Sequence, residues 1–205
     1  MKNTWIKETV EWIVCFIIAY VIYLVINYFV GTIAGVKQSS MYPTCHEGDR
    51  VVIGRRILYN KTLKRGDIVI VESPTVTENN TNTIATYDEK TGFAKFAYSV
   101  IGIGKMSYIK RVIGLPGEHL FISEDGYVYI NGEKLDESYL PEGTITPRLG
   151  DVYDVQIPEG YVFCIGDNRA GSMDCRMFGA VPMNKVEGKV IGRIWPLNKL
   201  GNIDK

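Results

Sequence analysis

The sequence predicts a predominantly β domain that follows a single membrane-spanning helix at the amino terminus. Residues 12–36 are almost all apolar, which indicates the helix. From Lys37 onward, short runs rich in Val, Ile, Tyr and Phe are separated by Gly, Pro, Asn and Asp, as is typical of strands and turns. No segment after Lys37 has the periodicity of a long amphipathic helix, so we expect the rest of the chain to be mostly β.

The apolar run is interrupted mainly by Asn27 and is long enough to be a transmembrane anchor. At about 1.5 Å per residue, such a helix crosses the roughly 30 Å hydrocarbon core of a bilayer. Lys2 and Lys7 precede the run, which favours a cytoplasmic amino terminus. The chain then divides into a short cytoplasmic amino terminus, a single-pass anchor and a domain on the extracytoplasmic face, over 1–11, 12–36 and 37–205.

An alternative interpretation of the amino-terminal run is a cleaved signal peptide. Basic residues precede it, and Thr32-Ile33-Ala34 imitates the small-x-small pattern of a cleavage site. The apolar region of a signal peptide is, however, typically only about 7–15 residues long. The length of the run from 12 to 36 therefore favours the anchor.

Turn signals separate the strands that we expect after the anchor. Asn131-Gly132 follows an apolar run and tolerates the positive φ angles of a type I′ hairpin turn. Residues 74–105 contain the polar stretch TVTENNTNT and a part without clean periodicity, which indicates an inserted loop or small hairpin. The predicted strands are 50–58, 67–71, 108–115, 119–122, 127–130, 161–165 and 186–194.

Charge and composition argue against several classes of function. Lys plus Arg and Asp plus Glu are equal at 23 each, so no charge excess indicates a nucleic-acid partner. The four cysteines form no CxxC pair, and neither histidine has a metal-ligand spacing such as HExxH. The sequence therefore indicates no disulfide framework, no metal site and no cofactor.

Three polar segments are candidates for chemistry. VKQSSMYPTCHEGD places two serines just after the anchor, YIKRVIGLPGE places Lys110 on a predicted strand, and GDNRAGSMDCRMFGAVP follows the apolar strand YVFCI. If Lys110 faces inward, burial lowers its pKa and leaves a neutral amine that can accept a serine proton. Taken one at a time, the segments are also compatible with a loop serine, a surface lysine and a structural loop.

Taken together, the segments SSMYPT, RGDIVIV, YIKRVIGLPGE and GDNRAGSMDCR with FGAVP, in that order behind an anchor, resemble the bacterial type I signal peptidase family. Their order and spacing extend the resemblance over essentially the whole chain. The resemblance implies a signal-peptidase-like antiparallel β-sheet domain. It also implies a membrane-bound serine endopeptidase, signal peptidase I, that uses a Ser/Lys dyad.

The resemblance also implies catalytic and supporting roles for individual residues. Ser40, the serine before Met, matches the nucleophile, and Lys110, the lysine before Arg, matches the general base. Ser172 matches the serine that orients the lysine. Asp174 and Arg176 match a supporting salt bridge.

The chain departs from the family pattern at two positions. Family members often have Ser or Gly two residues before the nucleophile, where a serine hydroxyl assists the oxyanion hole, and this chain has Gln38. We therefore expect the backbone N–H of Ser40 to be one oxyanion donor and an amide of Gln38 to be the second. Cys175 replaces the usual serine between Asp and Arg. We interpret it as an isosteric structural replacement and not as a second nucleophile.

Two further expectations concern the surroundings of the dyad. The family preference for small residues implies a shallow, apolar substrate pocket, with Met41 and Tyr42 near its rim. His46 is the only other plausible base near Ser40, and no carboxylate in its segment is placed to orient it. We therefore expect Lys110, and not His46, to activate Ser40.

The resemblance implies that the protein removes amino-terminal signal peptides from secretory preproteins with small-x-small cleavage sites. Its expected partners are these preproteins, membrane lipid and, transiently, the translocation channel. One alternative is a self-cleaving Ser/Lys peptidase, but such proteins are soluble and the anchor argues against it. Another is a catalytically inactive homologue that acts in pilus or secretion assembly. The presence of both Ser40 and Lys110 argues against that second alternative.

Overall fold

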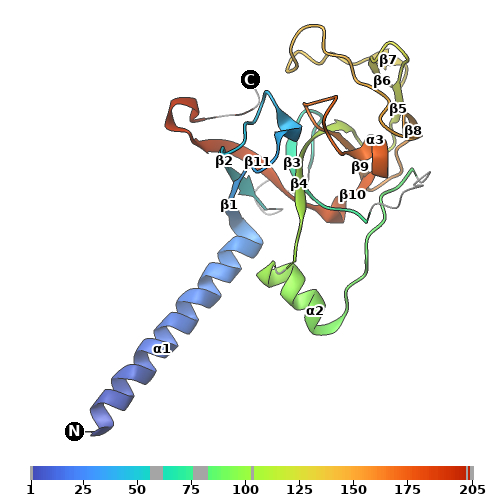
Figure 1. Ribbon diagram of the computed structural model, residues 1–205. Helices are drawn as coiled ribbons and strands as arrows, with labels where there is room; N and C mark the ends of the chain where they lie inside the picture. The colour runs from blue at the N-terminus through green and yellow to red at the C-terminus, as the bar shows by residue number, and fades with distance from the viewer. Residues whose placement is uncertain (1, 56–61, 76–82, 103, 202, 204–205) are drawn as a thin grey trace.

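Figure 1 shows the computed structural model, in which one long amino-terminal helix projects from a domain made mainly of strands. The structure describes residues 2–55, 62–75, 83–102, 104–201 and 203. Among these residues the strands form two sheets whose neighbouring strands are antiparallel. The prediction of a mostly β domain behind one apolar helix is confirmed.

The amino-terminal helix ends before the apolar run does. Helix α1 covers Lys2–Val25 and continues as a π-helical turn, η1, over Ile26–Val30. The segment Trp5–Val30 is long and apolar enough to cross a membrane, and its most apolar stretch is not buried against the domain. The helical part of the chain therefore stops at Val30, and not at residue 36 as the apolar run predicts.

The residues after η1 belong to the β domain. Gly31–Gly35 form strand β1, which pairs with β2 over its whole length. A Cβ on Gly31 would lie 2.5 Å from the carbonyl oxygen of Ile53, so glycine is what lets the two strands approach here. Val36 is buried in the core. The apolar character of the segment thus reflects a sheet edge and a core position as well as the apolar helix.

The larger sheet has seven strands in the order β1-β2-β11-β3-β4-β9-β10. Strand β4, Ser107–Gly114, pairs with β3 on one side and with β9 on the other. Strand β4 therefore lies between a strand that precedes it in the chain, β3, and a strand that follows it, β9. The other strands of this sheet, besides β1, are β2 (Arg50–Gly54), β3 (Ile68–Glu72), β9 (Tyr161–Ile165), β10 (Val181–Pro182) and β11 (Val186–Trp195). Residues 56–58, the end of the predicted strand 50–58, lie outside the described residues.

The smaller sheet has four strands in the order β7-β6-β5-β8. The predicted hairpin is formed, because β6 and β7 pair across Asn131 and Gly132, whose φ angles are 52° and 84°. These positive angles are those of a type I′ turn. The strands are β5 (His119–Ile122), β6 (Val128–Ile130), β7 (Glu133–Lys134) and β8 (Asp154–Gln156).

Short helices complete the fold. In the insert over 74–105, where a loop or hairpin is expected, the described part contains helix α2 (Gly92–Phe96) and the π-helical turn η3 (Ala97–Ile101). Residues 76–82 and 103 of the insert lie outside the described residues. The remaining short helices are η2 (Ser39–Met41), α3 (Cys175–Phe178), η4 (Met183–Lys185) and η5 (Leu197–Lys199).

The buried apolar side chains form two clusters. The larger one joins residues of both sheets, such as Val112 of β4 and Leu120 of β5. The smaller one includes Val36, which precedes the turn η2, and Met41, its last residue, together with Ile53 of β2. Both ends of the short segment that holds Ser40 are thus fixed to the sheet by apolar packing.

Candidate active site

Ser40 lies in the turn η2, which contacts β4, the strand that contains Lys110. Gln38, the residue before η2, is extended with φ of −132° and ψ of 153°, and the chain turns at Ser39. Ser40 is 5% exposed. Its Oγ is 2.8 Å from Nζ of Lys110 and 3.4 Å from the carbonyl oxygen of Ile109. The fold thus brings together the serine and the lysine that the sequence predicts to form a dyad.

Lys110 is placed by its position in the middle of a sheet. It lies opposite Val69 of β3, and the alternation of the strand sends its side chain and that of Arg111 to opposite faces. Lys110 is 1% exposed, so its amine has lost most of its contact with water. Burial lowers the pKa of Lys110 from 10.5 to about 8, although the nearby Asp174 carboxylate acts in the opposite direction. A neutral amine at this position can accept the proton of the Ser40 hydroxyl.

The loop after β9 holds the Ser40 turn in place. The backbone N–H of Asn168 donates to the carbonyl oxygen of Ser40 at 3.0 Å, and its side-chain amide donates to that of Ser39 at 3.2 Å. Gly166 packs directly beneath this contact. A Cβ at Gly166 would lie 2.4 Å from the Ser40 carbonyl oxygen and 2.2 Å from Oγ of Ser172. A residue with a side chain at 166 therefore could not pack here without moving the turn.

Ser172 is buried within the site, with 2% of its surface exposed. Its Oγ lies close to Gly166 and makes no hydrogen bond to any described residue. A buried hydroxyl without a partner is uncommon, because desolvation is then not compensated. Ser172 can therefore still donate to or accept from a group that moves toward it, and the Lys110 amine is the group for which the family resemblance predicts this role.

Asp174 and Arg176 form the expected salt bridge, with both side chains completely buried. Nε and Nη2 of Arg176 each donate to one carboxylate oxygen of Asp174 at 2.8 Å. The same carboxylate accepts the backbone N–H of Gly166 at 3.0 Å and that of Arg176 at 3.2 Å. These charge-assisted bonds fix the loop that packs on Ser40.

A second buried ion pair was not predicted from the sequence. Nε and Nη2 of Arg111 donate to the two carboxylate oxygens of Asp167 at 2.9 and 2.7 Å. The hydroxyl of Thr44 donates to the same carboxylate at 2.5 Å. The three residues join β4, the loop after β9 and the segment after η2. The alternation of the strand indicates that Arg111 lies on the face opposite to Lys110. Nothing in the sequence indicates which acidic residue pairs with Arg111 there.

The structure also places the residues predicted around the dyad. Gln38 is exposed, two residues before Ser40. Tyr42 is 54% exposed, with its ring edge-on to that of His46 at 5.2 Å between centroids. Met41, which the sequence predicts near a pocket rim, is completely buried in the smaller apolar cluster. Its neighbours in that cluster are core residues, so the side chain packs inward from the turn.

Cys175 and His46 can be compared with Lys110 as reactive groups. Cys175 is fully buried, and its Sγ accepts the backbone N–H of Cys164 at 3.1 Å. Burial raises the pKa of Cys175, which disfavours the reactive thiolate. Within the described hydrogen bonds, the base that contacts Oγ of Ser40 is Lys110 and not His46.

Comparison with known proteins adds to this geometry. The family of the signal peptidases, peptidase S26, matches residues 9–195. The chain is 34% identical to signal peptidase I of Bacillus licheniformis, with 95% of this chain and 92% of that protein covered. It is 32% identical to signal peptidase I T of Bacillus subtilis strain 168, with 97% and 96% covered. A crystal structure of a signal peptidase I from Enterococcus faecalis V583 matches with 25% identity and a TM-score of 0.39, over 62% of this chain and 96% of that one.

Proposed function

Because this chain belongs to the signal peptidase family, peptidase S26, we propose that it is a membrane-bound serine endopeptidase that removes amino-terminal signal peptides from secretory preproteins. Its substrates are precursors with small-x-small cleavage sites. Ser40 is the nucleophile and Lys110 is the general base. The observation that carries this assignment is the 2.8 Å contact between Nζ of a buried Lys110 and Oγ of Ser40.

The reaction follows from the protonation state of Lys110. Its neutral amine takes the Ser40 proton while Oγ bonds to the carbonyl carbon of the scissile peptide, and the carbonyl oxygen becomes an oxyanion. When this intermediate collapses, the C–N bond breaks and the ammonium of Lys110 gives its proton to the leaving amine. A water molecule, deprotonated by Lys110, then attacks the ester and releases the acid and Ser40.

The surrounding residues position the dyad. Ser172 orients the Lys110 amine during proton transfer. The buried Ser172 hydroxyl, which has no partner among the described residues, then has the amine as its partner. The pair of Asp174 and Arg176 supports the loop that carries Ser172. The backbone N–H of Ser40 is one donor to the oxyanion, and an amide of the exposed Gln38 is the second.

The apolar helix provides the link to the substrate. The segment Trp5–Val30 anchors the enzyme in the plasma membrane, with the amino terminus in the cytoplasm and the β domain on the extracytoplasmic face. A signal peptide is itself held in the bilayer, so the anchor raises the effective concentration of the active site near it. This placement also allows transient contact with the translocation channel. Tyr42, exposed beside the Ser40 turn, contacts the substrate near the cleavage site.

The proposal is tested by cleavage of a secretory precursor by full-length protein in liposomes. Ser40→Ala and Lys110→Ala should each lower the cleavage rate by at least about 1,000-fold, because removing either member disables the unit. His46→Ala and Cys175→Ser are the controls and should remain active. The new amino terminus of the product should follow a small residue. Absence of cleavage by the wild-type protein would instead favour a non-catalytic role in pilus or secretion assembly.

A further inference from the structure

A charged cavity of about 870 Å³ lies apart from the dyad, and neither Ser40 nor Lys110 lines it. One of its walls is the carboxyl end of the apolar span, residues 27–29. Another is the short helical segment over 92–101, formed by α2 and η3 and called the side helix below. Figure 1 shows α2 beside the end of α1 from which the β domain begins. The side helix therefore lies at the level where the span leaves the hydrocarbon region, if the span crosses a membrane.

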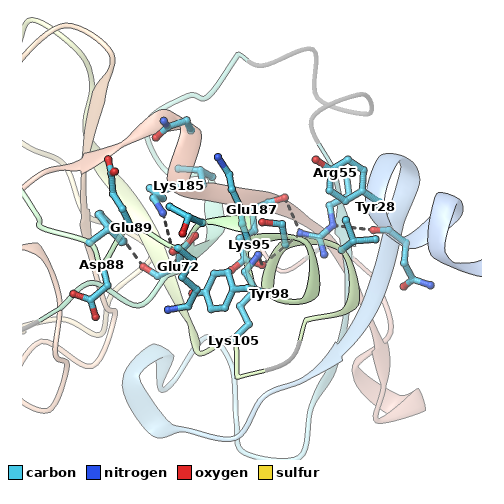
Figure 2. Close-up of a pocket in the computed structure, with 18 of the residues that line it drawn as sticks. Tyr28, Arg55, Glu72, Asp88, Glu89, Lys95, Tyr98, Lys105, Lys185 and Glu187 are labelled. Atoms are coloured by element: carbon cyan, nitrogen blue, oxygen red, sulfur yellow. Dashed lines mark hydrogen bonds and ion pairs between the residues drawn. The ribbon is translucent and has the colours of Figure 1, made fainter. Parts of the chain in front are cut away.

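The side helix is attached to the sheet and to the end of the span through charged residues (Figure 2). Tyr98 hydrogen-bonds to Glu72, and burial together with this carboxylate raises the pKa of Tyr98 to about 12. Lys105, just beyond the side helix, lies 3.3 Å from the Glu187 carboxylate. Arg55 lies 3.5 Å from the same carboxylate and donates at 3.1 Å to a backbone carbonyl at the end of the span. Glu187 thus links the side helix and the span, and these contacts fix one relative to the other.

The outer face of the side helix is apolar. Phe93 and Phe96 are 79% and 50% exposed, and their ring centroids are 6.2 Å apart. Residues three apart share one face of a helix, and neither ring lines the cavity, whereas Tyr98 does. Two large exposed rings on one face are a feature that marks binding to an apolar partner or to lipid.

Charged groups next to these rings are available for polar partners. Lys90 and Lys95 line the cavity, as do Asp88 and Glu89. None of these four takes part in an ion pair between described residues. Figure 2 shows Asp88 and Glu89 at the end of the cavity opposite Tyr28 and Arg55. The Lys90 ammonium lies 4.6 Å from the centroid of the Tyr98 ring. Charged groups of both signs without an ion-pair partner among the described residues complement the phosphate and ammonium groups of phospholipid headgroups.

Building on the proposed membrane anchoring, we propose that the side helix is a second contact of the β domain with the bilayer. Phe93 and Phe96 enter the boundary between headgroups and acyl chains, where aromatic rings of interfacial helices are favoured. Lys90 and Lys95 face lipid phosphates, and the cavity opens into the headgroup layer. The enzyme is then attached to the membrane at two places, and the orientation of the β domain above the surface is fixed.

The test uses an environment-sensitive fluorophore on single cysteines of the full-length protein. Among the native cysteines Cys15 is exposed and the other three are buried, so labelled wild-type protein reports on the span itself. In a Cys15→Ser background, Phe93→Cys and Phe96→Cys report on the side helix. Ile145→Cys is the matched control, because Ile145 is 61% exposed in the segment between β7 and β8, which lies on the side of the domain away from α1 (Figure 1). All are placed in phosphatidylethanolamine and phosphatidylglycerol vesicles with nitroxide-labelled lipids.

We expect the labels at 93 and 96 to shift to shorter emission wavelengths on reconstitution and to be quenched by nitroxides near the headgroups. The label at 145 should do neither, and the label at Cys15 should be quenched by nitroxides deep in the acyl chains. Labels at 93 and 96 that behave like the one at 145, with Cys15 quenched, would overturn the second contact and leave the anchor intact. A Cys15 label that escapes quenching would refute the anchor and the second contact with it.

Discussion

The position of one amine decides the chemistry of the site. Lys110 is buried against Ser40, and its pKa is lowered to about 8 mainly by burial. A surface lysine would be almost fully protonated at neutral pH and could not act as a base. Burial in the sheet therefore gives Lys110 the lowered pKa that the proposed general base needs.

The rate of peptide cleavage should depend on pH through Lys110. Only the neutral amine accepts the Ser40 proton, so kcat/KM should rise with pH and level off above about 8. The measurement is cleavage of a short soluble peptide by full-length enzyme in detergent, from about pH 6 to 10. A rate that stays constant over this range would contradict the assignment of Lys110 as base.

Lys110 should also reduce stability at neutral pH. Lowering its pKa from 10.5 to about 8 on folding reduces the free energy of unfolding by about 3 kcal/mol. This reduction is present in full below pH 8. Between about pH 8 and 10.5 the unfolded chain binds more protons, so stability rises with pH and the loss disappears.

Lys110→Met should therefore be inactive but more stable than wild type at pH 7. The free energy of unfolding should rise by at most about 3 kcal/mol from removing the buried amine. The lost hydrogen bond to Ser40 lowers this gain by about 1 kcal/mol. Denaturant unfolding in detergent at pH 7 and near pH 10.5 measures it. A variant that is less stable than wild type at pH 7 would show that the buried amine contributes net stability.

Residue patterns predict only part of this site. Ser40, Lys110 and the pair Asp174–Arg176 could be predicted because each lies in a block that resembles a known family. The pairing of Arg111 with Asp167 could not, because it joins segments that only the folded sheet brings together. The complete burial of Met41 could not be predicted either, because a turn beside a dyad does not reveal which of its side chains points inward.

At the scale of elements, the loop after β9 and the Ser40 turn act as one unit. Gly166→Ala should disturb this unit, because the added Cβ would meet the Ser40 carbonyl oxygen at 2.4 Å. A displacement of about 1 Å at a reacting group can cost on the order of 100-fold in rate, so a comparable loss of kcat is expected.

A matched control for Gly166→Ala is Gly35→Ala. A Cβ at Gly35 would meet no atom within 4 Å, and this variant should keep full activity. Circular dichroism of both proteins checks that the strands are retained. Equal activity of the two variants would show that the contact beneath Ser40 does not control the dyad.

The elements that the sequence predicts are those with a clear apolar period. The predicted strands 67–71, 108–115 and 161–165 correspond to β3, β4 and β9 within a residue or two. Strands β8 and β10 are not predicted, because two or three residues without an adjacent turn signal do not show an alternation. The helix α2 was missed for the same reason, since five residues are too few to show a helical period.

At the scale of the whole molecule, the apolar run and the β domain overlap in the sequence. Residues 31–35 continue the apolar run but form the edge strand that covers β2. The boundary between the two parts therefore lies at Gly31, and not at residue 37 as composition indicates.

Two truncated proteins test this boundary. A chain that begins at Gly31 should fold and cleave a soluble peptide, while its rate on a precursor in the membrane falls. A chain that begins at Lys37 lacks β1 and exposes the edge of β2, so it should unfold at a lower temperature and aggregate. Their thermal unfolding and peptide cleavage should be compared, and identical behaviour of the two proteins would contradict a structural role for β1.

The direct passage from η1 to β1 has a consequence for the choice of substrate. No linker separates the span from the sheet, and Arg55 binds the end of the span through the carbonyl oxygens of Asn27 and Val30. Ser40 follows β1 closely, so under the proposed anchoring its height above the bilayer is set by the fold. The enzyme should then select precursors by the length of the segment between the apolar core of the signal peptide and the cleavage site. A precursor is cleaved only where this segment spans that height. A precursor series with this spacer lengthened one residue at a time should show a sharp optimum in cleavage rate, whereas a flexibly tethered protease would accept every member.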